Sequence, residues 1–451
     1  MRQLRKRRLR AAGAGGVAVL ALCAAMGTAA SAKPAKPAVF PQKTCFWTNE
    51  IDSRFDTNPA HNYAFPDSGA VYWSAKVTMP AGSTIVFKGQ YAHARYQSLN
   101  SYNDATAAPI DAINDVSTRP NHGSTNPFLS GANRDAHKRS YTVTMVNEPP
   151  PVAPATVATN TLYAGVTGQT EQEILYRVYL PDSFKRGALT GGVALPNPEL
   201  RLADGTVLTG QAACNDLNPQ SGQLSITTVP LSLYDSLRDK PGEPATYPAA
   251  PKPVFRTYYN TSFILSCWYG ANCTGAPPRI GGQYSNIDNQ YVAAFVNRGF
   301  KAGPVLVLRG KLPTTPKTGP NDAQMGSGQL RYWSMCQNES LYTTKGAGCV
   351  NDSDVPVNGK GYYTIVTSLP KDRPKNAIAK CGVAYIPWPS QGDGAGHLND
   401  GFLILRNMLP SASFHHAIQD TTTPGDEHAV LGPYYPVGKY TTKAAFQKHG
   451  C

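Results

Sequence analysis

The chain has 451 residues, with 42 Lys and Arg against 29 Asp and Glu and a formal net charge of +13. Six basic residues and no acid lie before residue 11, so the chain after residue 32 carries a charge near 13 − 6 = +7. This mild excess, without a Lys/Arg run, argues against a nucleic-acid-binding protein. The length exceeds what one hydrophobic core usually organises, which predicts two domains.

Residues 1–32 have the pattern of a secretory signal peptide. A basic start is followed by an apolar run from Val17 to Leu22 and by the small residues Ala30-Ser31-Ala32. The pattern predicts cleavage after Ala32 and a secreted or extracytoplasmic protein of the cell envelope. The apolar run is too short to cross a bilayer as a helix, so no transmembrane segment is expected in the mature chain. A bulky Leu22 before Cys23 argues against lipidation.

Eight cysteines follow the signal peptide, and an even number in an exported chain predicts disulfide bonds. A metal site would need paired Cys-x-x-Cys spacing, which the chain lacks, and no metal or cofactor is predicted. Eight cysteines permit 105 pairings. The expected pairs are Cys45 with Cys214, Cys267 with Cys273, Cys336 with Cys349, and Cys381 with Cys451.

Short strands punctuated by 38 prolines and 41 glycines dominate the mature chain and predict a mostly β protein. Alternating polarity predicts strands at 141–146 and 363–366, and a continuous apolar run predicts another at 305–308. Asp204-Gly205 predicts a hairpin turn. The few expected helices are short, one around residues 233–237 before Pro241-Gly242 and one around 414–418.

The two halves of the chain repeat several short motifs. Arg95-Tyr96-Gln97-Ser98 recurs as Arg331-Tyr332-Trp333-Ser334, at an offset of 331 − 95 = 236. Val-Phe-Lys-Gly at 86–89 recurs as Val-Leu-Arg-Gly at 307–310, and the Arg-x-x-Leu-Pro motif at 177–181 recurs at 406–410. The repetition predicts a duplicated domain. The expected order is a signal peptide at 1–32, a first β-sandwich with a Pro-rich linker at 33–250, and a second β-sandwich at 251–451.

The Arg-Tyr-x-Ser segment, the following strand at Tyr141 or Tyr363, and the closing Arg-x-x-Leu-Pro motif resemble uncharacterised bacterial proteins grouped as domains of unknown function 1254 and 1214. The resemblance spans roughly residues 60–190 and 280–415. It implies two tandem, internally duplicated jelly-roll-like β-sandwich domains. It implies no established reaction.

The repeated arginines are the first candidates for function, because a guanidinium in an apolar, strand-rich neighbourhood needs a planar acceptor. Asp115 and Asp352 follow Arg95 and Arg331 by 115 − 95 = 20 and 352 − 331 = 21 residues, which predicts a pair within each half. These pairs are interpreted either as buried salt bridges or as part of a cleft for a carboxylate-bearing ligand. The ligand-binding candidates are Arg95, Tyr96, Asp115, Arg331, Tyr332 and Asp352.

Other side chains offer weaker candidates. Histidines and acids between residues 415 and 428 match no defined ligand spacing, and His93 is placed two residues before Arg95 on the same strand face. No Gly-x-Ser-x-Gly or His-Glu-x-x-His motif occurs, so no catalytic residue is predicted and an enzyme is not favoured. Aromatic residues that are candidates for sugar or lipid contact are Trp47, Tyr72, Trp73, Trp268, Tyr269, Trp333 and Trp388.

Three function classes remain open from the sequence. We favour a secreted binding protein for an envelope or extracellular ligand, either a glycan, a lipid or a carboxylate-bearing molecule. The alternatives are a secreted hydrolase with a site in the cleft between the two domains and a structural envelope component. A deep polar pocket with a perturbed His or carboxylate favours the enzyme, an exposed row of coplanar aromatic rings favours glycan binding, and a featureless surface favours the structural role.

Overall fold

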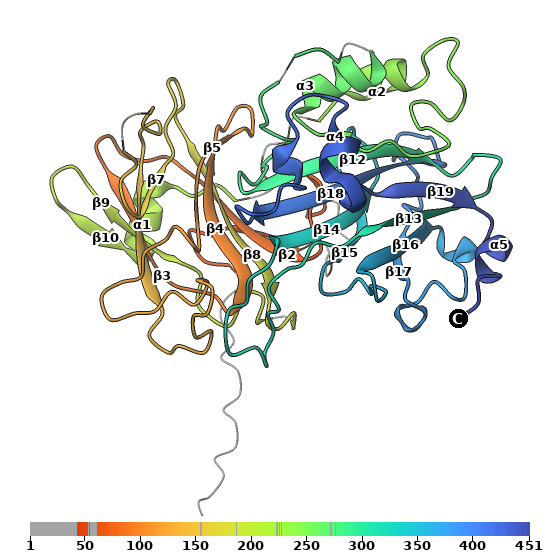
Figure 1. The fold of residues 1–451 in the computed structure, drawn as a ribbon. Helices are drawn as coiled ribbons and strands as arrows, with labels where there is room; N and C mark the ends of the chain where they lie inside the picture. The colour runs from red at the N-terminus through yellow and green to blue at the C-terminus, as the bar shows by residue number, and fades with distance from the viewer. Residues whose placement is uncertain are drawn as a thin grey trace, which may run out of the picture. The chain divides into compact units, whose positions relative to one another are not determined.

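The computed structural model describes residues 43–52, 54, 61–153, 156–185, 187–221, 224, 226, 228–270, 273–275 and 277–451. The predicted signal peptide lies outside these residues. Strands dominate the described part, as expected from its many short alternating segments (Figure 1). Residues 141–146 illustrate the cause, because Tyr141, Val143 and Met145 are buried while the threonines between them are half-exposed.

The first two sheets come from the first half of the chain and pack face to face as a sandwich. Their apolar inner faces form one core that contains Trp73, Phe87 and Tyr176. One sheet has the strand order β1 (Asn49–Ile51), β2 (Ala70–Val77), β8 (Gln172–Pro181), β4 (Ala94–Tyr102), β5 (Pro109–Asn114). The other has the order β10 (Val207–Thr209), β9 (Asn197–Arg201), β3 (Thr84–Gln90), β6 (Ser140–Val146), β7 (Thr161–Tyr163).

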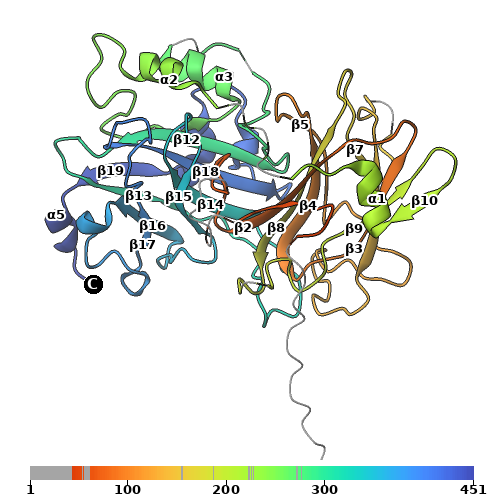
Figure 2. The same ribbon diagram turned by 180° about the vertical axis from the view of Figure 1, so that it is seen from behind.

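The second half of the chain forms a second sandwich, whose core contains Trp333, Tyr363 and Leu405. One of its sheets has the order β11 (Arg256–Thr257), β12 (Asn289–Asn297), β18 (Asp400–Pro410), β14 (Leu330–Asn338), β15 (Gly346–Asn351). The other has the order β17 (Ala384–Pro387), β16 (Tyr362–Ser368), β13 (Val305–Lys311), β19 (Val437–Thr441). Figure 2 shows the same strands from behind.

The strand orders of the two sandwiches correspond. When ten is added to each strand number of the first sandwich, the strand order of its first sheet becomes that of the third sheet. In the same way, β9-β3-β6-β7 becomes β19-β13-β16-β17, which is the order of the fourth sheet. The pairing directions also agree, since β6–β7 and β16–β17 are the parallel pairs. Strand β10, which follows the expected hairpin turn at Gly205, has no counterpart in this correspondence.

The repeated glycine of the Val-x-x-Gly motif has a packing role in both halves. Gly89 faces Tyr141 across β3 and β6, and Gly310 faces Tyr363 across β13 and β16. A Cβ atom would lie 2.5 Å from the ring of Tyr141 at the first position and 2.6 Å from the hydroxyl of Tyr363 at the second. The tyrosine ring therefore covers the bare glycine backbone, an arrangement that stabilises glycine within a strand.

Helices are few and short. The helix predicted around Leu233 is confirmed as α2 (Leu231–Arg238), whereas the one predicted around residues 414–418 is only the 3-10 turn η4 (Ile418–Asp420). The remaining elements are α1 (Gly210–Leu217), α3 (Thr261–Phe263), α4 (Glu427–Leu431), α5 (Lys443–Gln447), the π-helical η1 (Ile264–Tyr269), η2 (Pro370–Asp372), η3 (Ala379–Cys381) and η5 (Gly432–Tyr434). Within the described chain, no helix is both long and apolar enough to span a bilayer.

The four predicted disulfides are confirmed. Cys45–Cys214 closes the first half, and Cys336–Cys349 joins directly opposed residues of β14 and β15. Cys267–Cys273 and Cys381–Cys451 close shorter segments of the second half. Disulfides of this number are typical of proteins in oxidising compartments.

The β1-β2-β8-β4-β5 sheet is buried on both of its faces. Trp73 belongs to the core of the first sandwich, while its neighbour Tyr72 on the opposite face belongs to a separate cluster. That cluster also contains Tyr332 and Met408 from the second half, so the two sandwiches share an apolar interface. All described residues of both halves belong to one compact unit. The domain boundary near residue 250 stays a prediction.

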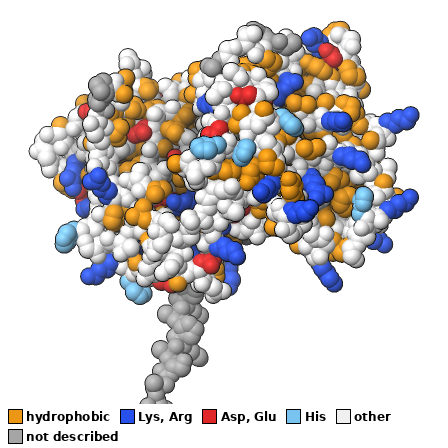
Figure 3. All heavy atoms as spheres, in the orientation of Figure 1, with side chains coloured by type: hydrophobic (Ala, Val, Ile, Leu, Met, Phe, Trp, Pro, Cys, Tyr) orange, Lys and Arg blue, Asp and Glu red, His pale blue; other side chains and the backbone are white. Residues whose placement is uncertain are grey.

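The outer surface carries the mild positive charge expected from the composition. Figure 3 shows Lys and Arg side chains scattered over one face with few Asp or Glu between them. The basic residues of this face are interspersed with apolar and uncharged ones. A scattered distribution of this kind is typical of a solvated surface rather than of one basic patch that docks an anionic partner.

Candidate functional site

The repeated arginines form ion pairs that cross between the two sandwiches. Arg95 Nη1 lies 2.5 Å from Asp352 Oδ1, and Arg331 Nη1 lies 3.5 Å from Asp115 Oδ1. The prediction that each arginine pairs with the aspartate of its own half is therefore wrong. The correct aspartate occupies the corresponding position in the other half.

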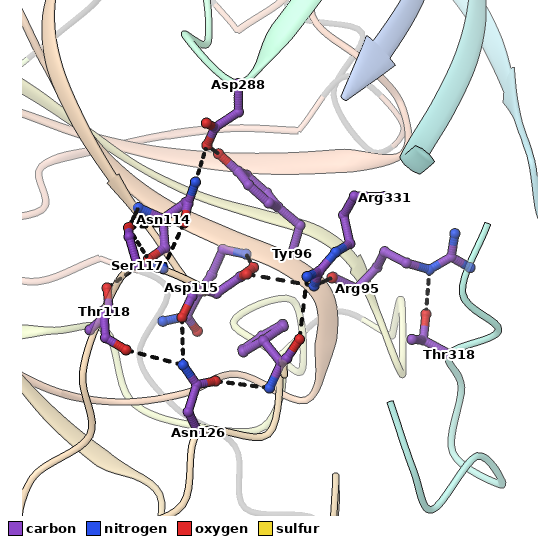
Figure 4. A network of polar contacts seen from close by, with 12 residues as sticks. Arg95, Tyr96, Asn114, Asp115, Ser117, Thr118, Asn126, Asp288, Thr318 and Arg331 are labelled. Atoms are coloured by element: carbon purple, nitrogen blue, oxygen red, sulfur yellow. Dashed lines mark hydrogen bonds and ion pairs between the residues drawn. The ribbon is translucent and has the colours of Figure 1, made fainter. Parts of the chain in front are cut away.

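Each arginine pairs with the aspartate of the other half because both aspartates lie at the interface between the sandwiches. Each carboxylate is held by its own half, because Asp115 Oδ2 accepts from Gln97 N at 2.8 Å and Asp352 Oδ2 accepts from Trp333 N at 2.9 Å. The other carboxylate oxygen faces the partner sandwich and its arginine. Figure 4 shows Arg331 reaching Asp115 in this way, while Arg95 extends toward Thr318.

The two crossed pairs differ in strength. The Arg95–Asp352 pair is 2% and 1% exposed, and Arg95 also donates to Thr318 and Ser353. The Arg331–Asp115 pair is longer, and Asp115 Oδ1 has no hydrogen-bond partner. Burial raises the pKa of Asp115 to about 7 against the opposing effect of Arg331. The first pair is thus the stronger link between the sandwiches.

The repeated tyrosines cross the interface in the same reciprocal manner. Tyr96 donates to Asp288 Oδ2 at 2.7 Å, and Tyr332 donates to Asp67 Oδ1 at 2.9 Å. Both rings pack edge-on against Tyr179, with centroids 5.4 and 5.2 Å away. Burial raises the pKa of both hydroxyls, so they act as neutral donors.

The structure thus brings all six sequence candidates into contacts between the sandwiches. Their proposed role in ligand binding stays a prediction. They do not belong to the described residues that line the cavity in this region. The side chains that do line it lie further along the same strands.

A cavity of about 70 Å³ lies between the two sandwiches. It is bounded by corresponding strands, β2 and β8 on one side and β12 and β18 on the other, and by the segments 63–66 and 282–286. The described lining residues are Ile51, Tyr63, Ala64, Phe65, Pro66, Tyr72, Leu175, Arg177, Tyr179, Leu224, Tyr258, Gly282, Gln283, Tyr284, Ser285, Asn286, Tyr291, Ile404 and Arg406.

The segments 63–66 and 282–286, which close the cavity, each bond to the opposite sandwich, as the ion pairs do. Phe65 N donates to Thr344 O at 2.8 Å in the second sandwich, and Tyr284 N donates to Ala107 O at 3.0 Å in the first. All four residues have positive φ, between 49° and 55°. Non-glycine residues rarely adopt this conformation, which costs of order 1–3 kcal/mol each and is characteristic of binding sites.

Two buried arginines face the cavity from corresponding positions. Arg177 on β8 pairs in register with Tyr72, and Arg406 on β18 pairs with Tyr291. Arg177 donates to Tyr284 O and Arg406 to Phe65 O, so each arginine fixes the closing segment contributed by the other half. A guanidinium is always charged, which places two cations in this wall.

The counter-charges of the two arginines differ. Arg406 Nη1 lies 3.7 Å from the carboxylate of Asp67, which is fully buried. Arg406 Nη1 also contacts Cys336 Sγ. Arg177 Nη1, by contrast, has no acid beside it and donates to the neutral amide oxygen of Asn100 at 2.6 Å. Within the described residues, no carboxylate lies within ion-pair distance of Arg177, and its Nε has no partner.

Two differences between the halves underlie this asymmetry. Asp67 N donates to the Tyr72 hydroxyl, and Asn286 N donates to the Tyr291 hydroxyl, so Asp67 and Asn286 occupy corresponding positions. The acid beside Arg406 is thus replaced by a neutral amide on the side of Arg177.

The second difference lies two residues further along. Leu180 N donates to Gly69 O and Leu409 N donates to Asp288 O, so the acid Asp288 stands where the first half has a glycine. The charge of Asp288 interacts with Arg177, but from beyond ion-pair distance.

The tyrosines of the wall do not supply the missing negative charge. Burial raises the pKa of Tyr72 and raises that of Tyr179 to about 12, so both are neutral phenols near pH 7. The rings of Tyr72 and Tyr102 lie 5.7 and 5.4 Å from the Arg177 guanidinium and give it partial cation–π stabilisation. A buried cation with only neutral partners remains costly.

Sequence reasoning identified Arg177 and Arg406 only as members of a repeated motif. Their signal was nevertheless visible, because a charged residue inside a continuous apolar segment such as Leu175 to Leu180 must meet a polar partner when both sheet faces are buried. The difference between Asp67 and Asn286 was not visible, since neither residue belongs to a recognisable motif.

The other sequence candidates lie in ordinary packing or capping roles, apart from Tyr72, which lines the cavity. The seven aromatic candidates are all buried, so these residues form no exposed row of rings. His93 contacts Arg139, and burial together with that cation lowers its pKa to about 4. Asp426 and Glu427 accept backbone N–H groups, and His416 bonds to Val430 O.

Among known proteins, the chain is similar to solved structures but matches no family model and no curated sequence. Among solved structures, a putative uncharacterised protein from Burkholderia cenocepacia is similar at 11% identity and a TM-score of 0.45, covering 86% of this chain and 81% of its own. The VPA0106 protein from Vibrio parahaemolyticus is similar at 12% identity and a TM-score of 0.40, covering 85% of this chain and 92% of its own.

Proposed function

We propose that the protein is an extracytoplasmic binding protein for a small carboxylate-bearing ligand, held in the cavity between the two sandwiches. One observation carries the proposal: Arg177 is a buried cation with a neutral Asn286 where Arg406 has the acid Asp67. A buried unpaired charge costs several kcal/mol, and an anion in the cavity removes that cost.

The guanidinium of Arg177 keeps donors for this anion. It has five N–H groups, of which Asn100 and Tyr284 each take one. A planar carboxylate matches the remaining N–H groups better than a spherical ion does, because a guanidinium presents its donors in one plane. The side chains around it are mostly aromatic or aliphatic, which strengthens an ionic contact by excluding water.

The size of the cavity favours a small carboxylate over the other ligand classes. A volume of about 70 Å³ is roughly half of the about 150 Å³ that holds one benzene ring in a protein cavity, so the ligand has few heavy atoms. A sugar ring or a lipid chain is larger than this. The hydroxyl of Ser285 in the wall donates its hydrogen to Ile280 O, so that hydrogen serves the fold rather than a ligand.

Secretion and duplication belong to the same proposal. The signal-peptide pattern and the four disulfides support export to an oxidising compartment. The matching strand orders and crossed contacts support a duplicated ancestral sandwich, and the motif resemblance supports membership of the tandem jelly-roll proteins named above. A duplicated module whose copies meet face to face creates a cavity lined by corresponding residues.

Isothermal titration calorimetry of the purified oxidised protein with acetate and propionate tests the proposal. We expect saturable binding that disappears in Arg177→Met, a variant that keeps the aliphatic packing but removes the charge. Arg95→Met is the matched control, since Arg95 is an equally buried arginine outside the described cavity wall. Binding that survives Arg177→Met but is lost in Arg95→Met assigns the ligand to the sequence-predicted residues and overturns this proposal.

A further inference from the structure

We propose that the cavity selects monoanionic, short-chain carboxylates and discriminates against dianions of the same size. This inference rests on the proposed function and names its ligand class. It follows from the count of charges around the cavity, from its volume and from the composition of its wall.

Counted within ion-pair distance, the charge of the wall is that of one net cation. Arg177 and Arg406 contribute two positive charges, and the buried carboxylate of Asp67 beside Arg406 contributes one negative charge. The buried carboxylate of Asp288 interacts with Arg177 from beyond that distance and accepts from Tyr96 and Asn114, so it offsets Arg177 only in part. No Asp or Glu occurs among the described lining residues. A monoanion neutralises this wall, whereas a dianion leaves an unpaired negative charge in a buried place, where unpaired charge is most costly.

A further acid, Glu173, does not change this balance directly. Glu173 lies behind Tyr284, whose hydroxyl donates to Glu173 Oε2 at 2.9 Å. Burial raises the pKa of Glu173 to about 7, so a large fraction is protonated at neutral pH. Any charge that Glu173 carries is negative, which further disfavours a second negative charge on the ligand.

The volume limits the chain length of the ligand. About 70 Å³ is roughly half of the volume that holds one benzene ring in a protein cavity, which limits the ligand to a carboxylate with a short chain. The described lining residues include Leu175, Leu224 and Ile404, which are apolar. A short aliphatic tail is therefore a better match to this wall than a second polar group.

The sharpest test compares two anions of nearly the same shape, oxamate with one charge and oxalate with two, by calorimetry at constant ionic strength. We expect oxamate to bind at least about tenfold more tightly than oxalate. In the aliphatic series, affinity should rise from acetate to butyrate and be lost for hexanoate. Expected dissociation constants lie on the order of 10 µM to 1 mM, as for ligands of this size.

Two matched substitutions change the charge of the wall by one unit. Asn286→Asp gives Arg177 the counter-charge that Asp67 gives Arg406, and it should abolish anion binding while the protein stays folded. Asp67→Asn raises the wall to two net positive charges and should reverse the preference toward oxalate. The melting temperature of each variant without ligand checks folding. If Asp67→Asn does not fold, the Asn286→Asp result decides alone.

The outcomes separate this inference from the proposed function. If oxalate binds the unmodified protein more tightly than oxamate, and Arg177→Met abolishes both, the cavity binds anions but the selectivity inference is overturned. If no anion binds in an Arg177-dependent way, the proposed function fails as well. Hexanoate that binds as tightly as butyrate overturns the size limit, because the tail then needs space that the cavity does not have.

Discussion

The crossed ion pairs give a quantitative prediction about how the two halves hold together. Arg95 and Asp352 are 2% and 1% exposed and their charged atoms are 2.5 Å apart. Removing one partner of such a buried pair leaves the other charge unpaired, at a cost of about 3–5 kcal/mol. We therefore expect Arg95→Met and Asp352→Asn each to lower the free energy of unfolding by about this amount.

A double-mutant cycle tests which residues form the pair. Equilibrium urea unfolding, followed by tryptophan fluorescence, gives the free energy of unfolding of both single variants and the double variant. We expect a coupling energy of about 2 kcal/mol or more between Arg95 and Asp352. The same cycle for Arg331 and Asp352, which form no ion pair with each other, should give a smaller coupling energy than the first. A larger coupling in the second cycle would refute the crossed arrangement.

Three further predictions concern stability. Because burial raises the folded-state pKa of Asp115 to about 7, its contribution to stability is present below its unfolded pKa and is lost as pH rises to 7, so Asp115→Asn should flatten the melting temperature between pH 4 and 7. Burial lowers the pKa of His397, but Asp393 more than offsets this, so stability should fall as pH rises through the raised value and His397→Asn should remove that fall. Replacing Cys45 and Cys214 by serine removes a link across 169 residues and should cost about 5 kcal/mol in urea unfolding.

The fold could be predicted from the sequence because its signals are local. Alternation at residues 141–146, the glycine turn at 204–205 and the even number of cysteines each report on nearby chain geometry, and the corresponding elements and disulfides are present. The helix expected at 414–418 is reduced to a turn, since Ala417 N donates to Asp420 and Ile418 N donates to Asn407 instead of continuing a helix.

The pairing of the charges could not be predicted, because the repetition makes two answers equivalent. Each half has an aspartate at the corresponding position, Asp115 or Asp352. The shorter sequence separation from Arg95 favours Asp115, which belongs to the same half. Only the placement of the two sandwiches decides between Asp115 and Asp352. The backbone N–H groups of Gln97 and Trp333 bind the inner carboxylate oxygens and leave the outer ones for the arginine across the interface.

The candidate site depends on how two similar halves differ. The corresponding strands place Arg177 and Arg406 in equivalent positions, and an exact repeat would give both arginines the same counter-charge. The exchange of Asp67 for Asn286 breaks that equivalence and leaves one cation without an acid within ion-pair distance. In a protein with two corresponding halves, residues that agree between the halves hold the fold, as Arg95 and Arg331 do. A buried position where the halves differ in charge is therefore the place to expect a ligand.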